Sequence, residues 1–518
     1  MVGVESDRPL LDRGPGIRIV CIDYSEAAID HTEIYAENCP TNMRTWDNRY
    51  ATENERWMEL KGKKILVVGL GKSGLASAIF LRSQGAQVTV SDVRSVEALA
   101  QELPALLDAG VMVEAGGHGL LTFRRQDWIV VSPGVPLDTP ELVQARGFGT
   151  PVIGELELAG RFLRGNTLAI TGSNGKTTTT ALCGEIFRAS GQPTQVGGNI
   201  GVPVISQVAQ SREDGWNVLE VSSFQLETIV DFHPKIAVIL NITPDHLDRH
   251  GSMEHYIAAK ERIFSNQTAD DFLVLNAENA ETQQAAVRAH SQIFWFSSRR
   301  PVRQGCFIYQ DAIVWRANEK AALEPVLPVS EISLKGEHNL ENVLAAVCAA
   351  KLAGISVDVI RKVVAEFRAV EHRLEFVARI HGVEYYNDSK ATNVDATMKA
   401  IAAFPGGIHL ILGGKDKNSD YTLLHPLLKE RVRAVYTIGA AAAKIEQQIA
   451  GAATVVSCQT LERAIEQAAT HAQAGDVVLL APACSSFDQF ENYEHRGRVF
   501  KQLVLARQGL EAWQNVSA

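Results

Sequence analysis

Cysteine is sparse in this sequence and follows no motif. The 518 residues contain seven cysteines, widely separated, and no two of them form a Cys-x-x-Cys pair. A dispersed, odd-numbered set is typical of a reducing compartment, and it argues against a disulfide framework or a cysteine-based zinc site. We therefore expect a cytoplasmic protein.

Long hydrophobic runs and runs of basic residues are also missing. No apolar stretch reaches the length that spans a bilayer, and the first residues lack the basic and apolar regions of a signal peptide. With 50 Lys and Arg against 60 Asp and Glu, the formal net charge is −10. These absences argue against a membrane or a nucleic acid as partner. An anionic small molecule stays compatible, because a single site can be locally basic.

What remains is the composition of an ordinary globular protein, with 46% hydrophobic and 21% charged residues. A chain of 518 residues exceeds what one hydrophobic core supports, so we expect three domains. Residues 1–57 show no sustained helical or strand period: polar residues interrupt most apolar clusters, of which residues 17–22 are the best. We expect a poorly ordered extension, or a working start at Met58. A small capping segment is the alternative.

From Lys64 onward, short apolar runs alternate with helical patterns, which is typical of parallel α/β sheets. Boundaries at residues 151–154 and near Val370 predict domains at 58–152, 153–369 and 370–518. The predicted strands are 65–68, 88–91 and 128–132 in the first block, 167–171, 218–221, 236–241 and 272–276 with short strands near 300–330 in the second, and 384–387, 409–412, 434–438 and 477–481 in the third; the first two predicted helices are 74–84 and 181–188.

The most informative segment is residues 168–179, Leu-Ala-Ile-Thr-Gly-Ser-Asn-Gly-Lys-Thr-Thr-Thr. A strand ends in glycines and a helix follows, an arrangement in which backbone N–H groups and the helix N-terminus can hold a phosphate. Lys176 is expected at the terminal phosphates and the Thr177 hydroxyl at Mg²⁺. The match to the general phosphate-loop motif is imperfect, because Ile170 stands where its first glycine belongs. An ordinary glycine-rich turn is the alternative.

A second glycine-rich turn, Gly-Leu-Gly-Lys-Ser-Gly, occupies residues 69–74 after the first predicted strand. Its spacing is that of a dinucleotide-binding turn, and Asp92 ends the next strand, where a ribose-binding acid would lie. The pattern alone leaves three interpretations open: a nicotinamide or flavin site, a site for another nucleotide, or a structural turn.

Polar side chains follow the strands of the second block. Glu220 stands among apolar neighbours at a strand end, which favours an Mg²⁺ ligand over a solvated glutamate. His246 stands between Asp245 and Asp248, a crowded setting that favours contact with substrate or metal. Lys260, on the following helix, is by default a solvated lysine.

Three polar clusters, at residues 387–393, 413–417 and 481–490, each follow a predicted strand of the third block. Because the carboxyl ends of parallel strands form the ligand-binding edge of an open α/β sheet, we expect these clusters to meet there. The segments Glu-His-Asn at 337–339 and Glu-His-Arg-Leu-Glu at 371–375 are polar too, but simple solvent exposure explains them equally well.

Taken together, these segments resemble the Mur ligase family over residues 58–510. Its short phosphate loop, Thr-Gly-x-x-Gly-Lys-Thr-Thr, begins here at Thr171 and is shared with folylpolyglutamate synthases. More specific are Ser-Pro-Gly-Val at 132–135, Gly-Asn-Ile-Gly at 198–201, Leu-Glu-Val-Ser-Ser-Phe-Gln-Leu-Glu at 219–227 and Ser-Ser-Phe-Asp-Gln-Phe at 485–490. The last two are characteristic of members that add D-glutamate.

The resemblance implies an α/β fold of three domains. These are a Rossmann-like N-terminal domain that binds the UDP of the substrate, a central P-loop ATPase domain and a Rossmann-like C-terminal domain that binds the amino acid. The resemblance also implies that the first glycine-rich turn belongs to a uridine-nucleotide site, formed by Gly71, Lys72, Ser73, Asp92 and Arg94.

The implied activity is ATP-dependent ligation of D-glutamate to UDP-N-acetylmuramoyl-L-alanine through an acyl phosphate, a step of peptidoglycan precursor synthesis. The implied catalytic residues are Lys176, His246 and Lys260, the last in carbamylated form. Mg²⁺ would be held by Thr177, Glu220, His246 and carbamylated Lys260. ATP would lie against Gly172, Ser173, Asn174, Gly175, Lys176, Thr177, Thr178, Asn339, Arg373 and Asp388.

The remaining implied contacts concern the two other substrates. Asn199 would contact the UDP-linked substrate, and D-glutamate would lie near Lys390, Thr392, Lys417 and Ser486. Tyr493 stands where family members often have phenylalanine, so its hydroxyl adds a group to that contact. We expect a monomer without nucleic-acid or membrane partners.

Three other functions stay open at this point. They are a sister ligase that adds another amino acid, or a folylpolyglutamate synthase; a non-catalytic nucleotide-dependent switch; and a nicotinamide-dependent enzyme. The intact first domain argues against the folylpolyglutamate synthases, and the presence of every expected catalytic residue argues against a non-catalytic protein.

Overall fold

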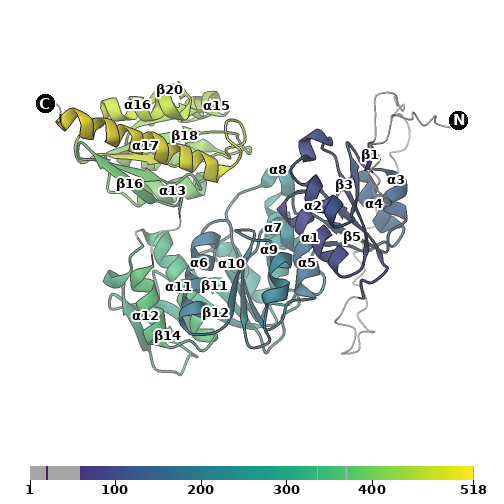
Figure 1. Cartoon of the computed structure of the whole chain (residues 1–518). Helices are drawn as coiled ribbons and strands as arrows, with labels where there is room; N and C mark the ends of the chain where they lie inside the picture. The colour runs from purple at the N-terminus through teal and green to yellow at the C-terminus, as the bar shows by residue number, and fades with distance from the viewer. Residues whose placement is uncertain (1–18, 22–58, 335, 368–370, 517–518) are drawn as a thin grey trace. The chain divides into compact units, whose positions relative to one another are not determined.

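The computed structural model describes residues 19–21, 59–334, 336–367 and 371–516 (Figure 1). The chain forms two compact units. The first comprises the chain up to Arg164 together with residues 197–212 and 224–232. The second comprises residues 165–196, 213–223 and the chain from His233 onward.

The first unit is built on a parallel sheet with strand order β1-β4-β3-β2-β5-β6. Its strands are near-continuous apolar runs, as expected where both faces are covered, and Ile65, Leu66 and Val67 are fully buried. The elements are β1 Ile19–Cys21, β2 Lys64–Val68, α1 Lys72–Ser83, β3 Gln87–Asp92, α2 Leu103–Asp108, β4 Met112–Ala115, α3 Leu120–Arg124, β5 Trp128–Val131, α4 Pro140–Gly147, β6 Val152–Gly154 and α5 Glu155–Gly160.

One strand of this sheet comes from the N-terminal extension. β1 pairs in parallel with β4, with Ile19 opposite Val113 and Cys21 opposite Ala115. The sequence predicted no strand before residue 58, because the apolar run of residues 19–22 is too short to show a period. The rest of the extension, for which poor order was expected, lies outside the described residues.

A nine-stranded sheet with order β15-β14-β13-β12-β11-β10-β7-β9-β8 forms the first part of the second unit. β13 pairs antiparallel with β14, and β14 with β15, which confirms the short strands predicted near residues 300–330. The elements are β7 Asn166–Thr171, α6 Lys176–Ala189, β8 Thr194–Gly198, β9 Trp216–Glu220, α7 Ser223–Leu226, β10 Ile236–Ile239, α8 Leu247–His250, α9 Met253–Glu261, β11 Phe272–Asn276, α10 Ala280–Ala285, β12 Gln292–Ser297, β13 Gly305–Tyr309, β14 Ala312–Arg316, β15 Glu324–Pro328, α11 Glu337–Leu352 and α12 Val357–Glu366.

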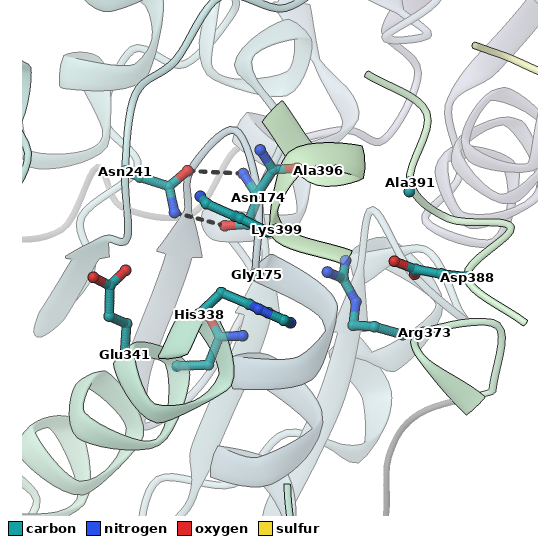
Figure 2. A pocket seen from close by; sticks show the side chains of 11 residues that line it. Asn174, Gly175, Asn241, His338, Glu341, Arg373, Asp388, Ala391, Ala396 and Lys399 are labelled. Carbon is teal, nitrogen blue, oxygen red and sulfur yellow. Dashed lines mark hydrogen bonds between the residues drawn. The ribbon is translucent and has the colours of Figure 1, made fainter. Parts of the chain in front are cut away.

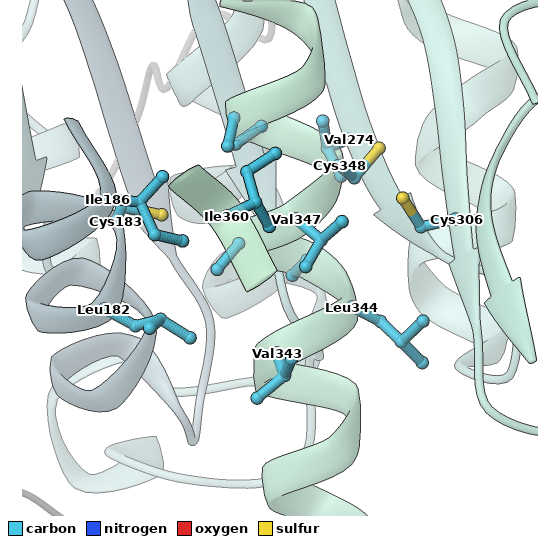
Figure 3. Close-up of a cluster of buried hydrophobic side chains, with 14 of the residues drawn as sticks. Leu182, Cys183, Ile186, Val274, Cys306, Val343, Leu344, Val347, Cys348 and Ile360 are labelled. Atoms are coloured by element: carbon cyan, nitrogen blue, oxygen red, sulfur yellow. The ribbon is translucent and has the colours of Figure 1, made fainter. Parts of the chain in front are cut away.

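The core beside this sheet is centred on α11, which packs on α6, α12 and the strands β11 and β12. Figure 3 shows Leu344 and Val347 of α11 among side chains of α6, β11 and α12. Eight consecutive residues of α11, from Val343 to Ala350, have no exposed surface. A helix that is apolar on all sides is typical of an element enclosed by its neighbours.

A second six-stranded sheet, with order β16-β17-β21-β18-β19-β20, forms the C-terminal part of the second unit. Side chains of α13, α14 and α15 fill one hydrophobic cluster against it and those of α16 and α17 fill another, so helices cover both faces. The elements are β16 Glu375–Ile380, β17 Val383–Asn387, α13 Val394–Ala402, β18 Ile408–Gly413, α14 His425–Arg431, β19 Val432–Ile438, α15 Ala442–Gln448, β20 Thr454–Gln459, α16 Leu461–His471, β21 Val477–Leu480 and α17 Tyr493–Val516.

The strands of this sheet run parallel except β16, which pairs antiparallel with β17. Since the other strands end at one edge, the polar clusters after β17, β18 and β21 are brought to that edge, as the sequence predicted. Among the described residues, no helix is both long and apolar enough to cross a membrane.

Candidate active site

The phosphate loop joins the end of β7 to the start of α6. Gly175 is the last residue before the helix, with a φ of +87°, a left-handed conformation that glycine adopts without strain. A Cβ at this position would lie 2.1 Å from Asn342 Oδ1, so there is no room for any side chain. The backbone N–H groups of the first turn of α6 are therefore left uncovered to bind an anion.

Residues after β10 hold the loop from the side. The backbone N–H of Ser173 donates to the carbonyl of Asn241 at 2.9 Å, and the N–H of Asn174 donates to Asn241 Oδ1 at 2.9 Å. The Ser173 hydroxyl donates to the carbonyl of Thr243 at 2.8 Å. The loop conformation is thus fixed by the protein itself before any ligand binds.

Lys176 folds back across the loop. Its Nζ donates to the carbonyls of Gly172 and Ser173 at 2.8 and 2.9 Å. Burial lowers the pKa of Lys176, while the nearby carboxylates of Glu220 and Asp245 oppose that shift. A lysine held on carbonyl oxygens in this way can move to a phosphate without leaving the loop.

Hydroxyl and carboxylate groups at the start of α6 fit a hard cation. Within the described residues, the buried Oγ1 atoms of Thr177 and Thr178 have no hydrogen-bond partner. Glu220, at the end of the adjacent strand β9, is 1% exposed. Buried polar oxygens without a partner are costly, and an oxygen-ligated Mg²⁺ would satisfy them.

His246 lies just before α8, in a left-handed conformation with φ +54°. Burial lowers the pKa of its imidazole to about 4, and Lys417 adds to that shift, while Asp245 opposes it. His246 is therefore neutral at physiological pH, which is the form that ligates a metal ion. Asp245 beside it accepts a hydrogen bond from Asn393 Nδ2 at 2.9 Å and lies 3.4 Å from Lys417 Nζ.

Lys260 of α9 is 1% exposed and is not the solvated lysine that its local sequence suggests. Its Nζ donates to the carbonyl of Gly172 at 2.8 Å and lies 4.6 Å from the centre of the Tyr256 ring. Burial lowers the pKa of Lys260 well below its usual value, and the charge of Lys176 adds to this shift. The uncharged amine, which is nucleophilic, is thereby favoured.

Figure 2 shows a pocket that brings Arg373 and Asp388 to the phosphate-loop residues Asn174 and Gly175. Its wall also contains His338 at the start of α11. Burial raises the pKa of Asp388 to about 6, although Arg373 opposes the shift. Burial lowers the pKa of His338 to about 3. The pocket thus offers a cation, a carboxyl group and a neutral imidazole beside a phosphate-binding turn.

Asn339 does not line this pocket. It lines a neighbouring cavity of about 410 Å³ whose wall includes the aromatic rings of Phe376, Tyr386 and Phe404. Its Oδ1 accepts a hydrogen bond from Asn342 Nδ2 at 3.2 Å. Asn339 thus reaches the pocket of Figure 2 through Asn342, which lines it.

The residues expected around the amino-acid substrate lie at the carboxyl edge of the C-terminal sheet. Lys390 Nζ donates to the Tyr493 hydroxyl at 2.9 Å and lies 4.5 Å from the centre of the same ring. Burial lowers the pKa of Lys390 to about 8. The tyrosine hydroxyl that departs from the family pattern is thus engaged by a lysine of the same cluster. Ser486 is 2% exposed, and Thr392 is half-buried.

Sequence reasoning missed Arg496, which is fully buried in α17. Its guanidinium donates to Ser389 Oγ at 2.9 Å, to the Ser389 carbonyl at 2.8 Å and to the Cys484 carbonyl at 3.2 Å. It therefore ties the loop after β17 to the loop after β21. One signal was available: an arginine three residues after Tyr493 lies on the same side of a helix.

The first unit contains its own cavity, of about 730 Å³, at the glycine-rich turn after β2. All five residues expected at the uridine nucleotide, Gly71, Lys72, Ser73, Asp92 and Arg94, line it. The Asp92 carboxylate accepts the backbone N–H of Leu70 at 2.6 Å and pairs with Arg94 at 3.1 Å. Asn199 also belongs to the first unit and is exposed there.

Three family models match the chain. They are the Mur ligase MurD-like N-terminal domain at residues 63–154, the Mur ligase middle domain at 170–350 and the Mur ligase glutamate ligase domain at 372–484. Together with the phosphate loop and the mostly parallel sheets, these matches define an ATP-dependent ligase that forms amide bonds. The chain belongs to the Mur ligase family, whose members use ATP and Mg²⁺.

Curated relatives cover most of the chain. The UDP-N-acetylmuramoylalanine–D-glutamate ligase of Acidobacterium capsulatum is 70% identical over 461 residues, which are 89% of this chain and 100% of that protein. The protein of the same name from Koribacter versatilis is 60% identical over 447 residues, 86% of this chain and 98% of its own.

Solved structures of lower identity share the fold. A pseudomurein peptide ligase from Methanothermus fervidus aligns with a TM-score of 0.56 at 19% identity, covering 86% of this chain and 100% of its own. The UDP-N-acetylmuramate–alanine ligase of Thermotoga maritima aligns with a TM-score of 0.53 at 20% identity, covering 86% and 100%. These likenesses confirm the three-domain α/β fold class.

Proposed function

We propose that this chain ligates D-glutamate to UDP-N-acetylmuramoyl-L-alanine at the expense of ATP, in peptidoglycan precursor synthesis. The observation that carries the proposal is the 70% identity to the Acidobacterium ligase over the whole length of that protein. The site supports the same chemistry, since it joins a phosphate loop to buried oxygen ligands and to lysines at a second sheet edge.

In the proposed reaction the substrate carboxylate attacks the γ-phosphorus of ATP, and ADP leaves. The amine of D-glutamate then attacks the acyl carbon, loses a proton and displaces phosphate, leaving an amide. Lys176 would leave its carbonyl partners to offset charge on the transferring phosphoryl group. Mg²⁺ would neutralise phosphate oxygens when bound. Thr177, Glu220, His246 and Lys260 are the residues proposed to hold it.

We further propose that Lys260 is carbamylated. Its burial and depressed pKa favour the neutral amine, which can add to CO₂ and lose a proton to form a carbamate. The modification turns this neutral amine into an anion next to Lys176, so it offsets the charge of that lysine and adds a carboxylate-like metal ligand.

The remaining roles follow the division of the chain. We assign the UDP-substrate to residues 58–152 with Asn199, ATP to residues 153–369 with Arg373 and Asp388, and D-glutamate to residues 370–518. Asn339 would then contact a part of the nucleotide away from the phosphates. We propose a cytoplasmic monomer.

The test is phosphate release from ATP with Mg²⁺, UDP-N-acetylmuramoyl-L-alanine and single amino acids. We expect release only when D-glutamate and the UDP-linked substrate are both present. Equal rates with L-alanine or a diamino acid would assign the chain to a sister ligase. Release without any amino acid would contradict coupled ligation.

A further inference from the structure

Arg373 is presented to the pocket of Figure 2 by an unusual stretch of backbone. The residues on either side of it, His372 and Leu374, have positive φ values of 66° and 41°. Non-glycine residues adopt this conformation only where their surroundings impose it. Among the described residues, the buried Nε of Arg373 finds no hydrogen-bond partner. The position of this side chain therefore depends on what holds the backbone around it.

The stretch is held first by side chains of its own sheet. The backbone N–H of His372 donates to Glu375 Oε2 at 2.9 Å. Asn387 Nδ2 donates to the same oxygen at 3.1 Å and to His372 Nδ1 at 2.9 Å. Glu375 therefore fixes the turn as long as its carboxylate keeps this position.

Helix α17 supplies the second support, through two residues one turn apart. Lys501 Nζ bonds to Glu371 Oε1 at 2.9 Å and to Glu375 Oε1 at 2.5 Å. Gly497 lies against the His372 ring, where a Cβ would come within 2.2 Å of Nδ1. Residues four apart share one face of a helix, so Gly497 and Lys501 both face this stretch. The glycine leaves room for the His372 ring, and the lysine contributes a positive charge.

We propose that Lys501 is a positioning residue for ATP: its ammonium bridges Glu371 and Glu375 and so fixes the backbone that presents Arg373. The inference rests on the proposed function in one respect, that Arg373 contacts ATP. Lys501 itself bonds to the two carboxylates, does not line the pocket and is assigned no contact with the nucleotide.

The charge of Lys501 is the important property. Ligand atoms of Glu371, His372 and Glu375 lie within 4.8 Å of one another, which is also the arrangement of a metal site. Here the lysine ammonium supplies the positive charge between the two carboxylates. Without it, two like charges at this separation repel each other, and the turn that they flank is free to open.

The experiment measures ATP affinity by calorimetry in the presence of Mg²⁺ on the full chain. We expect Lys501→Met to weaken ATP binding about tenfold, a size typical of coupled neighbouring groups. Lys501→Arg should restore most of the affinity, since a guanidinium can also bridge two carboxylates. The matched control is Lys429→Met, which removes the same charge from an exposed site on α14 and should change nothing.

The double variant Arg373→Ala/Lys501→Met separates positioning from general destabilisation. If Lys501 acts through Arg373, the double variant binds ATP no more weakly than Arg373→Ala alone. The inference is overturned if the two effects add, or if Lys501→Met binds ATP within twofold of the unchanged chain. Should Lys501→Met fail to fold, Glu371→Gln weakens the same bridge at an exposed carboxylate, and an unchanged ATP affinity there would equally overturn it.

These outcomes are distinct from failure of the proposed function. A chain that binds ATP in this pattern but releases no phosphate with D-glutamate and the UDP-linked substrate would contradict the function and leave the role of Lys501 intact. A competent ligase whose Lys501→Met variant keeps full ATP affinity would contradict only the role of Lys501.

Discussion

The two glycine-rich turns of this chain have the same plan and different chemistry. Each follows a parallel strand and precedes a helix that begins with a lysine, Lys72 in α1 and Lys176 in α6. In each turn the carbonyl of the first glycine accepts a hydrogen bond of 2.8 Å. In the first turn the donor is the Ser132 hydroxyl, and in the second the buried amine of Lys260 and the amine of Lys176 both donate.

The two turns differ in whether a carboxylate of the protein already bonds to the turn. In the first turn the backbone N–H of Leu70 already donates to the Asp92 carboxylate, which in turn pairs with Arg94. The protein thus supplies its own anion, and the turn shapes a cavity. In the second turn the buried Thr177 hydroxyl has no hydrogen-bond partner within the described residues. In the first unit the glycine-rich turn and the acid at the end of β3 thus line one cavity, as in a dinucleotide-binding turn, whereas in the second a buried hydroxyl is left for a ligand.

The largest expected contrast is between the two lysines. Lys176→Ala should abolish phosphate release, because removing a group that acts on transition-state charge costs about 3–4 kcal/mol, and the melting temperature should stay nearly unchanged. Lys72→Ala, the same change in an exposed turn that lines the proposed UDP-substrate cavity, should leave kcat intact and act only on the KM for that substrate. Retention of half the activity by Lys176→Ala would contradict the assigned role.

The next prediction concerns Lys260, which donates to the glycine carbonyl of the second turn. Lys260→Ala should be nearly inactive and partly rescued by acetate, because a small carboxylate can fill the gap and supply the missing metal ligand. Lys260→Arg should be no better than alanine, since a guanidinium cannot carry the carbamate. Full activity of Lys260→Arg would mean that a simple cation suffices. Initial rates with and without acetate decide this.

The two turns also differ in how much space their glycines leave for a side chain. Gly175→Ala combines a φ of +87° with a Cβ only 2.1 Å from Asn342 Oδ1. We expect a loss of about 1–3 kcal/mol in the free energy of unfolding and a clear loss of ATP affinity. Gly71→Ala meets nothing within 4 Å and should be tolerated. Urea unfolding of both variants is the measurement, and equal losses would remove the distinction.

A smaller effect is expected from the carboxylate that fills the first turn. Asp92→Asn weakens the pair with Arg94, whose side chain is 40% exposed, so the pair is worth at most about 1 kcal/mol. The KM for the UDP-linked substrate should therefore rise by no more than about fivefold, with kcat unchanged. A fall in kcat with KM unchanged would place Asp92 in the chemistry and contradict this view.

The smallest effect is expected from the N-terminal extension. Removing residues 1–57 deletes β1, which pairs with β4 through three residues at the edge of the first sheet. We expect activity and melting temperature to stay nearly the same, because an edge strand with three paired residues adds few hydrogen bonds to the sheet. Thermal unfolding and initial rates of the truncated chain test this, and a marked fall in melting temperature would show that the extension stabilises the first unit.

Much of this architecture could be predicted because its strands are buried on both faces. β11 has the predicted bounds, Phe272–Asn276, since an apolar run bounded by polar residues defines both ends. β10 ends at Ile239, two residues earlier than predicted, because Asn241 turns to hold the phosphate loop. A periodic pattern cannot distinguish a polar residue that ends a strand from one that begins a site.

The parts that could not be predicted depend on contacts between distant residues. Arg496 joins two loops more than 90 residues apart, and its spacing from Tyr493 indicates a shared helix face but not these two partners. The segments 197–212 and 224–232 belong to the first unit although they follow β7 in sequence. The burial of Lys260 likewise depends on Gly172, 88 residues away, and its own helix predicts an exposed lysine.

Helix α11 has a consequence for anyone who alters this chain. Its first turns carry His338 and Asn342 in the wall of the pocket, and the buried stretch from Val343 to Ala350 follows without a break. Four alanines in that stretch let neighbouring elements approach closely, so a larger side chain there would displace the helix axis. Engineering for thermal tolerance should therefore leave α11 untouched. A substitution in the buried stretch would also shift His338 and Asn342 in the pocket wall. Such a substitution would confer resistance to a pocket-directed inhibitor without contacting it.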